Sequence, residues 1–186
     1  MMHPVTLDDV VSMDATQLDR AMRDGGPVDR TALRDRMYDG VSLNLPSVVE
    51  KLTWVKFTKV FKADGEGLRG WNCKVEQSGL NAPWVLSRSR GAPKTYGHYR
   101  VVSTADYTMP RPYGGGDCML DYGLGKNPRL DPTSRVRDPV VALDEASELL
   151  LGWSYVDLGL TRTATPSYFV LRRGAPLDHD AKPPRG

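Results

Sequence analysis

Cysteine is scarce in this sequence, and so is histidine. The 186 residues contain two cysteines, Cys73 and Cys118, and three histidines. One cysteine pair is no disulfide framework, and the chain has no Cys-x-x-Cys motif or Cys/His cluster of the kind that holds zinc. We therefore expect two reduced, buried thiols, no metal site and no cofactor.

Long apolar runs and a dominant charge are also missing. The most apolar stretch, Leu149–Trp153, is far too short to span a bilayer, and the first residues lack the pattern of a secretory signal. The 25 basic and 23 acidic residues give a net charge of +2, which alone does not indicate a nucleic-acid or membrane partner. These absences predict a cytoplasmic protein with no membrane partner.

The charge is unevenly spread along the chain. Residues 1–40 hold 5 basic and 8 acidic side chains, whereas residues 50–100 hold 10 basic and 4 acidic ones. The acidic piece could lie against a basic body, or the basic stretch could face an anionic partner. A solvated face of a sheet would have the same composition.

The N-terminal part of the chain has the pattern of short helices. Thr6 with Asp9, and Asp14 with Gln17, have the spacing of capping boxes, in which side chains satisfy the free backbone donors of a first helical turn. We expect a helical hairpin over residues 1–37.

From Tyr38 onward the hydrophobic period changes to two, which indicates strands. Thr53–Lys62 and Leu68–Glu76 alternate on both sides of an Asp64-Gly65 turn, as a half-buried antiparallel hairpin does. The other expected strands are Tyr38–Leu43, Tyr96–Ser103, Cys118–Tyr122, Pro139–Leu143, Leu149–Leu158 and Tyr168–Arg172.

About eight short strands with Gly- and Pro-rich connections, and no long helix between them, predict a mainly β fold. We expect an antiparallel up-and-down barrel or a strongly curved sheet over residues 38–173. A short helical turn is expected near Pro46, and residues 174–186, rich in proline, are expected to form a mobile tail.

Catalytic motifs are weak. Gly114-Gly115-Gly116 is followed by a strand rather than a helix, so it reads as a turn and not as a phosphate cradle. His98 with Asp121 could serve in an acid–base site, but no spacing demands it. We assign no catalytic residue.

Lysines alternate with aromatic residues in the first hairpin strand, a pattern that can hold single-stranded nucleic acid. Phe57 and Phe61 share their face with only one lysine, Lys59, while Lys56 and Lys62 share the other face with Trp54. This phasing favours an ordinary sheet with one face toward the core and one face toward solvent.

Aromatic residues in several strands are the more informative signal. If the sheet closes, they could converge on an interior wide enough for one small ligand. The alternative is a filled core without a cavity. The candidate ligand-binding residues are Trp71, His98, Tyr99, Tyr122, Trp153 and Tyr155.

The order of a short N-terminal helical region and then about eight strands over Tyr38–Arg173 resembles the lipocalin-like (calycin) barrels. Where that family has Gly-x-Trp, this chain has glycine directly before tryptophan, in Gly70-Trp71 and Gly152-Trp153. The resemblance implies binding of a hydrophobic small molecule, or isomerisation or cyclisation within the cavity. It assigns no ligand residue here.

We therefore expect a non-catalytic binding protein that encloses an apolar small molecule or a hydrophobic peptide, acting as an accessory protein in a biosynthetic pathway. One alternative is a small barrel enzyme of cyclase or isomerase type. Another is a module that binds a protein partner or nucleic acid through the basic 50–100 surface or an exposed sheet edge. Pairing of two chains through such an edge is left open.

Overall fold

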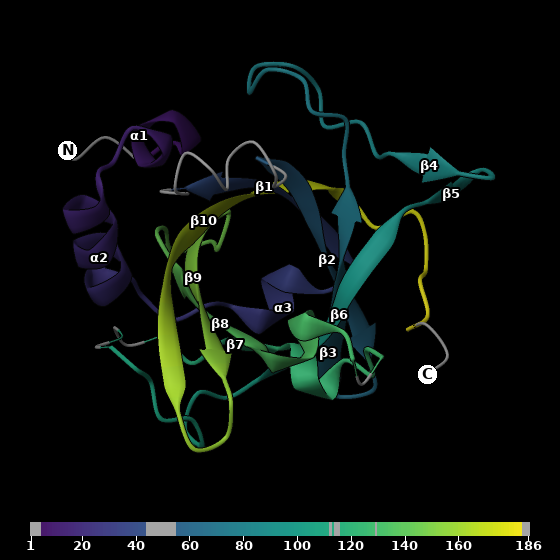
Figure 1. Ribbon diagram of the computed structural model, residues 1–186. Coiled ribbons are helices and arrows are strands. Elements are labelled where there is room, and N and C mark those ends of the chain that lie inside the picture. Colours follow the sequence, from purple (N-terminus) through teal and green to yellow (C-terminus); the bar gives the residue numbers. More distant parts are fainter. Residues whose placement is uncertain (1–4, 44–54, 112, 114–115, 129, 184–186) are drawn as a thin grey trace.

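The computed structural model describes residues 5–43, 55–111, 113, 116–128 and 130–183. Over these ranges, eight antiparallel strands close into a barrel in which each strand pairs with the next barrel strand along the chain (Figure 1). A separate hairpin, β4 (Arg88–Ser89) and β5 (Ala92–Pro93), is inserted between the third and fourth of them. The barrel strands are β1 (Arg36–Leu43), β2 (Lys56–Asp64), β3 (Gly67–Lys74), β6 (Thr95–Val102), β7 (Met119–Asp121), β8 (Val136–Ala142), β9 (Leu149–Asp157) and β10 (Arg162–Pro176).

The barrel closes between its first and last strands. Gly40 of β1 lies opposite Leu171 of β10 on one side and opposite Phe57 of β2 on the other. Among the described residues, every barrel strand therefore has two neighbours, which removes the free edges of an open sheet. The prediction of a mainly β, antiparallel up-and-down barrel is confirmed.

The expected hairpin is present as β2 and β3, with Asp64 opposite Gly67 and Gly65 in the turn at a φ of +61°. That positive φ suits glycine, which has no Cβ to clash. The helical turn expected near Pro46, and Trp54, lie outside the described residues.

Both predicted capping boxes are present. The Thr6 side chain accepts from the backbone N–H of Asp9, and Asp14 accepts from that of Gln17; in each box the reciprocal bond is made. No helix in the described ranges is long and apolar enough to cross a membrane. The helices are α1 (Leu7–Val11), α2 (Ala15–Asp24), α3 (Arg30–Leu33), and the single-turn 3-10 helices η1 (Tyr122–Leu124) and η2 (Pro132–Arg135).

The first two helices lie on the outside of the barrel (Figure 1). Leu18 and Met22 of α2 belong to one buried hydrophobic cluster with Trp153 of β9 and Val170 of β10. This wall of the barrel is consequently buried on both faces, and its strands read as continuous apolar runs.

The third helix closes one end of the barrel. Leu33 of α3 is fully buried in the interior cluster with Tyr38, Phe61 and Leu150, and Figure 1 shows α3 within the ring of strands. Apolar side chains therefore fill the barrel interior at this end.

The last strand is longer than the expected Tyr168–Arg172, because β10 runs from Arg162 to Pro176. The chain then continues along the outer face of β2 and β3, where Asp180 lies 2.8 Å from Lys62 Nζ and 2.5 Å from Arg69. The segment expected to be a mobile tail thus begins within β10 and then makes ion pairs with the barrel.

Candidate functional site

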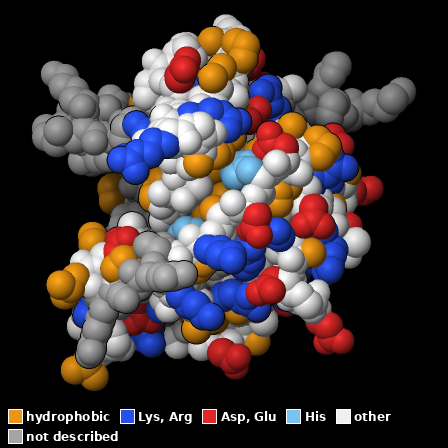
Figure 2. Space-filling view, turned by 90° about the vertical axis from the view of Figure 1, so that its right-hand side faces the viewer, with side chains coloured by type: hydrophobic (Ala, Val, Ile, Leu, Met, Phe, Trp, Pro, Cys, Tyr) orange, Lys and Arg blue, Asp and Glu red, His pale blue; other side chains and the backbone are white. Residues whose placement is uncertain are grey.

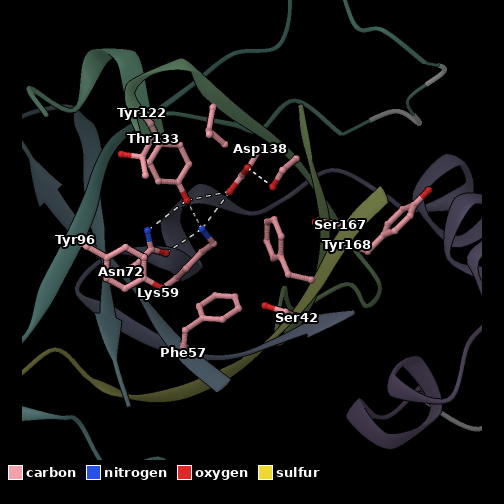
Figure 3. Close-up of a pocket in the computed structure, with 13 residues that line it drawn as sticks. Ser42, Phe57, Lys59, Asn72, Tyr96, Tyr122, Thr133, Asp138, Ser167 and Tyr168 are labelled. Atoms are coloured by element: carbon pink, nitrogen blue, oxygen red, sulfur yellow. Dashed lines mark hydrogen bonds and ion pairs between the residues drawn. The ribbon is translucent and has the colours of Figure 1, made fainter. Parts of the chain in front are cut away.

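The end of the barrel opposite α3 contains a cavity of about 240 Å³ (Figure 3). It lies inside the ends of the strands, from Ser42 near the end of β1 to Phe57 near the start of β2. The side chains that line it are Ser42, Phe57, Lys59, Asn72, Tyr96, Tyr122, Thr133, Val136, Asp138, Ser154, Ser167, Tyr168 and Phe169.

Four polar side chains from different elements meet inside this cavity: Lys59, Asn72, Tyr122 and Asp138, here called the floor cluster. Lys59 Nζ lies 3.2 Å from Asp138 Oδ2 and 2.5 Å from the Tyr122 hydroxyl oxygen. It also donates to Asn72 Oδ1 at 3.1 Å. The Asp138 carboxylate accepts two further bonds, from Tyr122 at 2.9 Å and from Ser154 at 2.7 Å.

Strand alternation explains why these charges point inward. Lys59 stands between Phe57 and Phe61 on β2, and all three side chains face the barrel interior because side chains two apart share a face. Asp138 occupies the same kind of position on β8, between Val136 and Val140. Each charged group is therefore carried into the interior by an otherwise apolar face.

The ion pair is almost completely buried, since the Lys59 and Asp138 side chains are each 3% exposed. Burial lowers the pKa of Lys59, although the Asp138 carboxylate acts in the opposite direction. Burial, with the Asp138 charge next, raises the pKa of Tyr122 well above its ordinary value. Tyr122 is therefore a neutral phenol at pH 7, and its hydroxyl donates a hydrogen bond to Asp138. The floor cluster carries no net charge.

Aromatic rings surround the ammonium group. Lys59 Nζ lies 4.8 Å from the ring centre of Phe169, 5.3 Å from Tyr99 and 5.6 Å from Phe57. Within about 6 Å a cation is attracted by the negative face of such a ring. The rings thus lower the cost of burying the charge and give the cavity apolar walls.

Two of these rings are placed by glycines on the neighbouring strands. Phe169 lies opposite Gly152 and Phe57 lies opposite Gly40 in the strand register. A Cβ added at Gly152 would stand 2.3 Å from the Phe169 ring, and one at Gly40 would stand 2.4 Å from the Phe57 ring. The absent side chains leave room for each ring to lie against its partner strand.

Replacing Gly152 by Ala is expected to push the Phe169 ring toward the cavity and to lower the free energy of unfolding by about 1–3 kcal/mol, the usual cost of overpacking. Urea denaturation measures the loss. Gly26→Ala is the control, because a Cβ there has its nearest neighbour at 4.0 Å. Equal stability of the two variants would contradict the close packing of Phe169 on Gly152.

The residues predicted to bind a ligand are divided by the barrel wall. Tyr99 and Tyr122 lie in the interior cluster, and Tyr122 lines the cavity. Trp153 and Tyr155 lie in the outer cluster under α2. Trp71 packs on the outside against residues of the C-terminal segment. The expected convergence of all five aromatic residues on one interior is therefore wrong.

Sequence reasoning missed most of the floor cluster. Lys59 was singled out only as the one lysine on the apolar face of its strand, and Asp138, which directly precedes Pro139, was not predicted as a site residue. The available signal was a charged residue at an inward position of an alternating strand, once on β2 and once on β8. Asn72 carried no such signal, because its neighbours Trp71 and Cys73 read as the core side.

His98 lies outside this cavity, against Trp71 with the ring centres 6.1 Å apart. It lines a second hollow of about 260 Å³ together with Arg69, Arg100 and Lys126. Figure 2 shows basic and acidic side chains side by side with histidine on this face of the molecule. Burial, and then the charge of Arg69, lowers the pKa of His98 to about 4. His98 is therefore neutral at pH 7.

This neutral His98 predicts a loss of stability in mild acid. Its pKa is near 6.5 in the unfolded chain, so between pH 6.5 and 4 the unfolded state binds more protons and stability falls as the pH falls. The stability difference between the native chain and His98→Gln should drop by up to about 3 kcal/mol across this window. Urea denaturation of both at pH 7, 5.5 and 4.5 measures it, and a constant difference would contradict the burial of a neutral imidazole.

Asp121, the other candidate acid–base residue, has a structural role. Its carboxylate accepts from the Tyr107 hydroxyl at 2.5 Å and from the backbone N–H of Gly123 at 2.7 Å, and it lies 3.0 Å from Arg137 Nε. The bond from Gly123, together with one from the backbone N–H of Leu124, caps η1 at its first turn. Within the described ranges, no group of three or more His, Cys, Asp or Glu side chains could hold a metal ion.

Two of the lysines in the lysine and aromatic pattern of β2 are buried instead of lying on an accessible nucleic-acid surface. Lys56 is 1% exposed and Lys59 is 2% exposed. Lys56 Nζ donates to Ser78 Oγ at 3.1 Å and to the Ala82 carbonyl at 3.1 Å, and it lies 4.0 Å from the ring centre of Trp84. Neither ammonium group is placed to meet a phosphate.

Comparison with known proteins does not assign this cavity. No protein-family model matches the chain, and no curated protein or solved structure matches it significantly. The function is therefore inferred from the residues that build the cavity.

Proposed function

We propose that the protein is a non-catalytic binding protein that holds one compact, mostly apolar small molecule in the open end of its barrel. The observation that carries this proposal is the buried floor cluster inside a cavity with aromatic walls. Small-molecule sites typically combine apolar walls with a few placed polar groups that orient the ligand. Here Phe57 and Phe169 supply the walls, and the hydroxyl, amide and ion pair of the floor cluster supply the polar end.

The size of the cavity favours a small molecule over a hydrophobic peptide. Its volume of about 240 Å³ lies just below the range of roughly 300–1,000 Å³ that is usual for ligand pockets. A ligand with a single ring and one polar substituent suits this space. The described barrel strands also offer no free edge to which a peptide could add as a further strand.

The architecture supports a role like that of the lipocalin-like carriers, whose ligands also lie inside an eight-stranded barrel. We propose a carrier or accessory role in the cytoplasm, where the unpaired, buried Cys73 and Cys118 would stay reduced. A small barrel enzyme of cyclase or isomerase type is the second candidate. The contact of a phenol and a carboxylate in the cavity, Tyr122 with Asp138, supports it because such a pair can relay a proton.

Native mass spectrometry of the freshly purified protein is the first test. We expect an excess mass of one small molecule, lost on denaturation, and an added aromatic alcohol such as benzyl alcohol to bind with a stoichiometry of one. The absence of both a retained ligand and benzyl alcohol binding would contradict the proposal.

A variant at the cavity wall tests the location of binding. Val136 is half-buried and lines the cavity, so Val136→Trp is expected to fill the space and to weaken benzyl alcohol binding at least about tenfold. Val85 is exposed on a loop away from the cavity, and Val85→Trp is the matched control, expected to bind like the native chain. Ligand-observed NMR titration measures both. Equal loss in the two variants, or none in either, would place the site elsewhere.

A further inference from the structure

The floor cluster contains the parts of a carbonyl-capturing site. A primary amine, Lys59 Nζ, lines a cavity with aromatic walls, and it contacts a carboxylate at 3.2 Å and a phenol at 2.5 Å. The same phenol, Tyr122, contacts the carboxylate of Asp138 at 2.9 Å. Figure 3 shows the lysine and its three partners converging inside the cavity. Amine, proton acceptor and proton donor are therefore all within contact of one another.

We propose that Lys59 binds a compact aromatic aldehyde as a reversible Schiff base, so that the ligand held in the cavity is an aldehyde. This inference rests on the proposed function and names its ligand class. A buried lysine in an apolar pocket is a known type of activated amine nucleophile. The rings of Phe57 and Phe169 would flank the aromatic ring of such a ligand.

The protons of this reaction can be followed through the floor cluster. Asp138 takes a proton from the Lys59 ammonium, and the free amine attacks the carbonyl carbon to form a carbinolamine, with net transfer of a proton from nitrogen to oxygen. The hydroxyl then leaves as water with the proton that Asp138 returns through Tyr122. The product is a protonated imine beside the Asp138 carboxylate, so one aldehyde and one ammonium give one iminium ion and one water.

The charge of the floor cluster favours a neutral aldehyde over an acid. Asp138 already neutralises Lys59, so a carboxylate ligand would bring an unpaired negative charge into a buried site. The iminium product keeps the original balance of one positive and one negative charge. Binding by imine formation thus leaves the net charge of the cavity unchanged.

Lys56 provides a control within the same chain. It is as deeply buried as Lys59. Its Nζ donates hydrogen bonds to Ser78 and to backbone carbonyls. Within the described part of the chain, it forms no hydrogen bond to a carboxylate or a phenol. It also does not line the cavity. If burial alone made a lysine reactive, Lys56 and Lys59 would react with an aldehyde equally. The cavity and its proton relay predict reaction at Lys59.

The test is reductive trapping with benzaldehyde and sodium cyanoborohydride, followed by intact mass measurement and peptide mapping. At limiting benzaldehyde, we expect one benzyl group on Lys59, with labelling at least about tenfold above that of the exposed Lys126 and of Lys56. Val136→Trp should abolish the labelling at Lys59 without changing that of Lys126. Tyr122→Phe should slow it by roughly 100-fold, the size of a lost general-acid step.

Benzyl alcohol, which has the same ring but no carbonyl, separates the two proposals. If benzyl alcohol binds in the cavity but benzaldehyde labels all lysines alike, the Schiff-base inference is overturned and the binding proposal stands. If neither compound binds, both are overturned. Because the labelling ratio is measured within the native chain, the result does not depend on the folding of a Lys59 variant.

Discussion

Replacing Asp138 by Asn is expected to lower the free energy of unfolding by about 3–5 kcal/mol at pH 7, because removing one partner of a buried ion pair leaves the other charge uncompensated. Lys59 would keep only the Asn72 and Tyr122 contacts and the weak attraction of its aromatic neighbours. Urea denaturation followed by fluorescence measures the loss.

The pH dependence of this variant identifies the cause. Without the carboxylate, the pKa of Lys59 in the folded state should fall further below its ordinary value of about 10.4. Between the folded and unfolded pKa values of Lys59, the unfolded chain then binds more protons than the folded one. The loss of stability caused by Asp138→Asn should therefore shrink as the pH rises toward 10.

A partly exposed ion pair is the matched control for Asp138, since the Arg23 side chain is 49% exposed and that of Asp19 is 32% exposed. Asp19 pairs with Arg23 on the surface of α2 at 2.7 Å, and such pairs contribute about 0.3–0.5 kcal/mol. We therefore expect Asp19→Asn to be nearly neutral. If Asp138→Asn costs no more than Asp19→Asn, the Lys59 pair is not buried as described, and the polar end of the proposed binding site is lost with it.

Replacing Trp153 by Ala is expected to cost about 3–5 kcal/mol, the range for truncating a fully buried large aromatic residue. Trp153 is 0% exposed in the outer cluster between β9 and α2, and the Arg111 guanidinium lies 4.8 Å from its ring centre. The substitution would leave a void under α2, so thermal and urea denaturation should both report a large loss.

The outer position of Trp153 adds a second expectation to the same experiment. Because the ring lies outside the barrel, Trp153→Ala should leave benzyl alcohol binding within about twofold of the native chain under conditions where it stays folded. Leu160→Ala is the control for stability, since Leu160 is fully exposed. A normal melting temperature for Trp153→Ala would contradict the burial of this ring, and a loss of binding without a loss of stability would place the ring in the ligand site.

Much of the fold could be predicted because its signals are local. The capping boxes at Thr6 and Asp14 depend on residues three positions apart, and the structure confirms both. The β2–β3 hairpin depends on alternation and on the glycine at its turn, which are also local. The length of β10 was missed because its register shifts between Ala164 and Tyr168, a bulge that interrupts the alternation.

The candidate site was predicted only in part, because both faces of several strands are buried. Alternation separates two faces but does not say which one lies inside when helices or a C-terminal segment cover the other. Trp71 and Trp153 are as buried as Tyr99, yet they lie on the outer face. Tyr122 was identified as a candidate, but its partners Lys59 and Asp138 stand 63 and 16 residues away in the chain.

The sequence by itself determined the local structure: where the first hairpin turns, which helices are capped, and that Lys59 stands on the apolar face of its strand. Only the tertiary structure decided that the sheet closes, that α3 fills one end, and that Lys59 and Asp138 meet inside the other. The physical reason is range. Caps and alternation involve neighbours within a few residues, whereas a buried ion pair forms only where closure of the barrel brings β2 against the distant β8 across one interior.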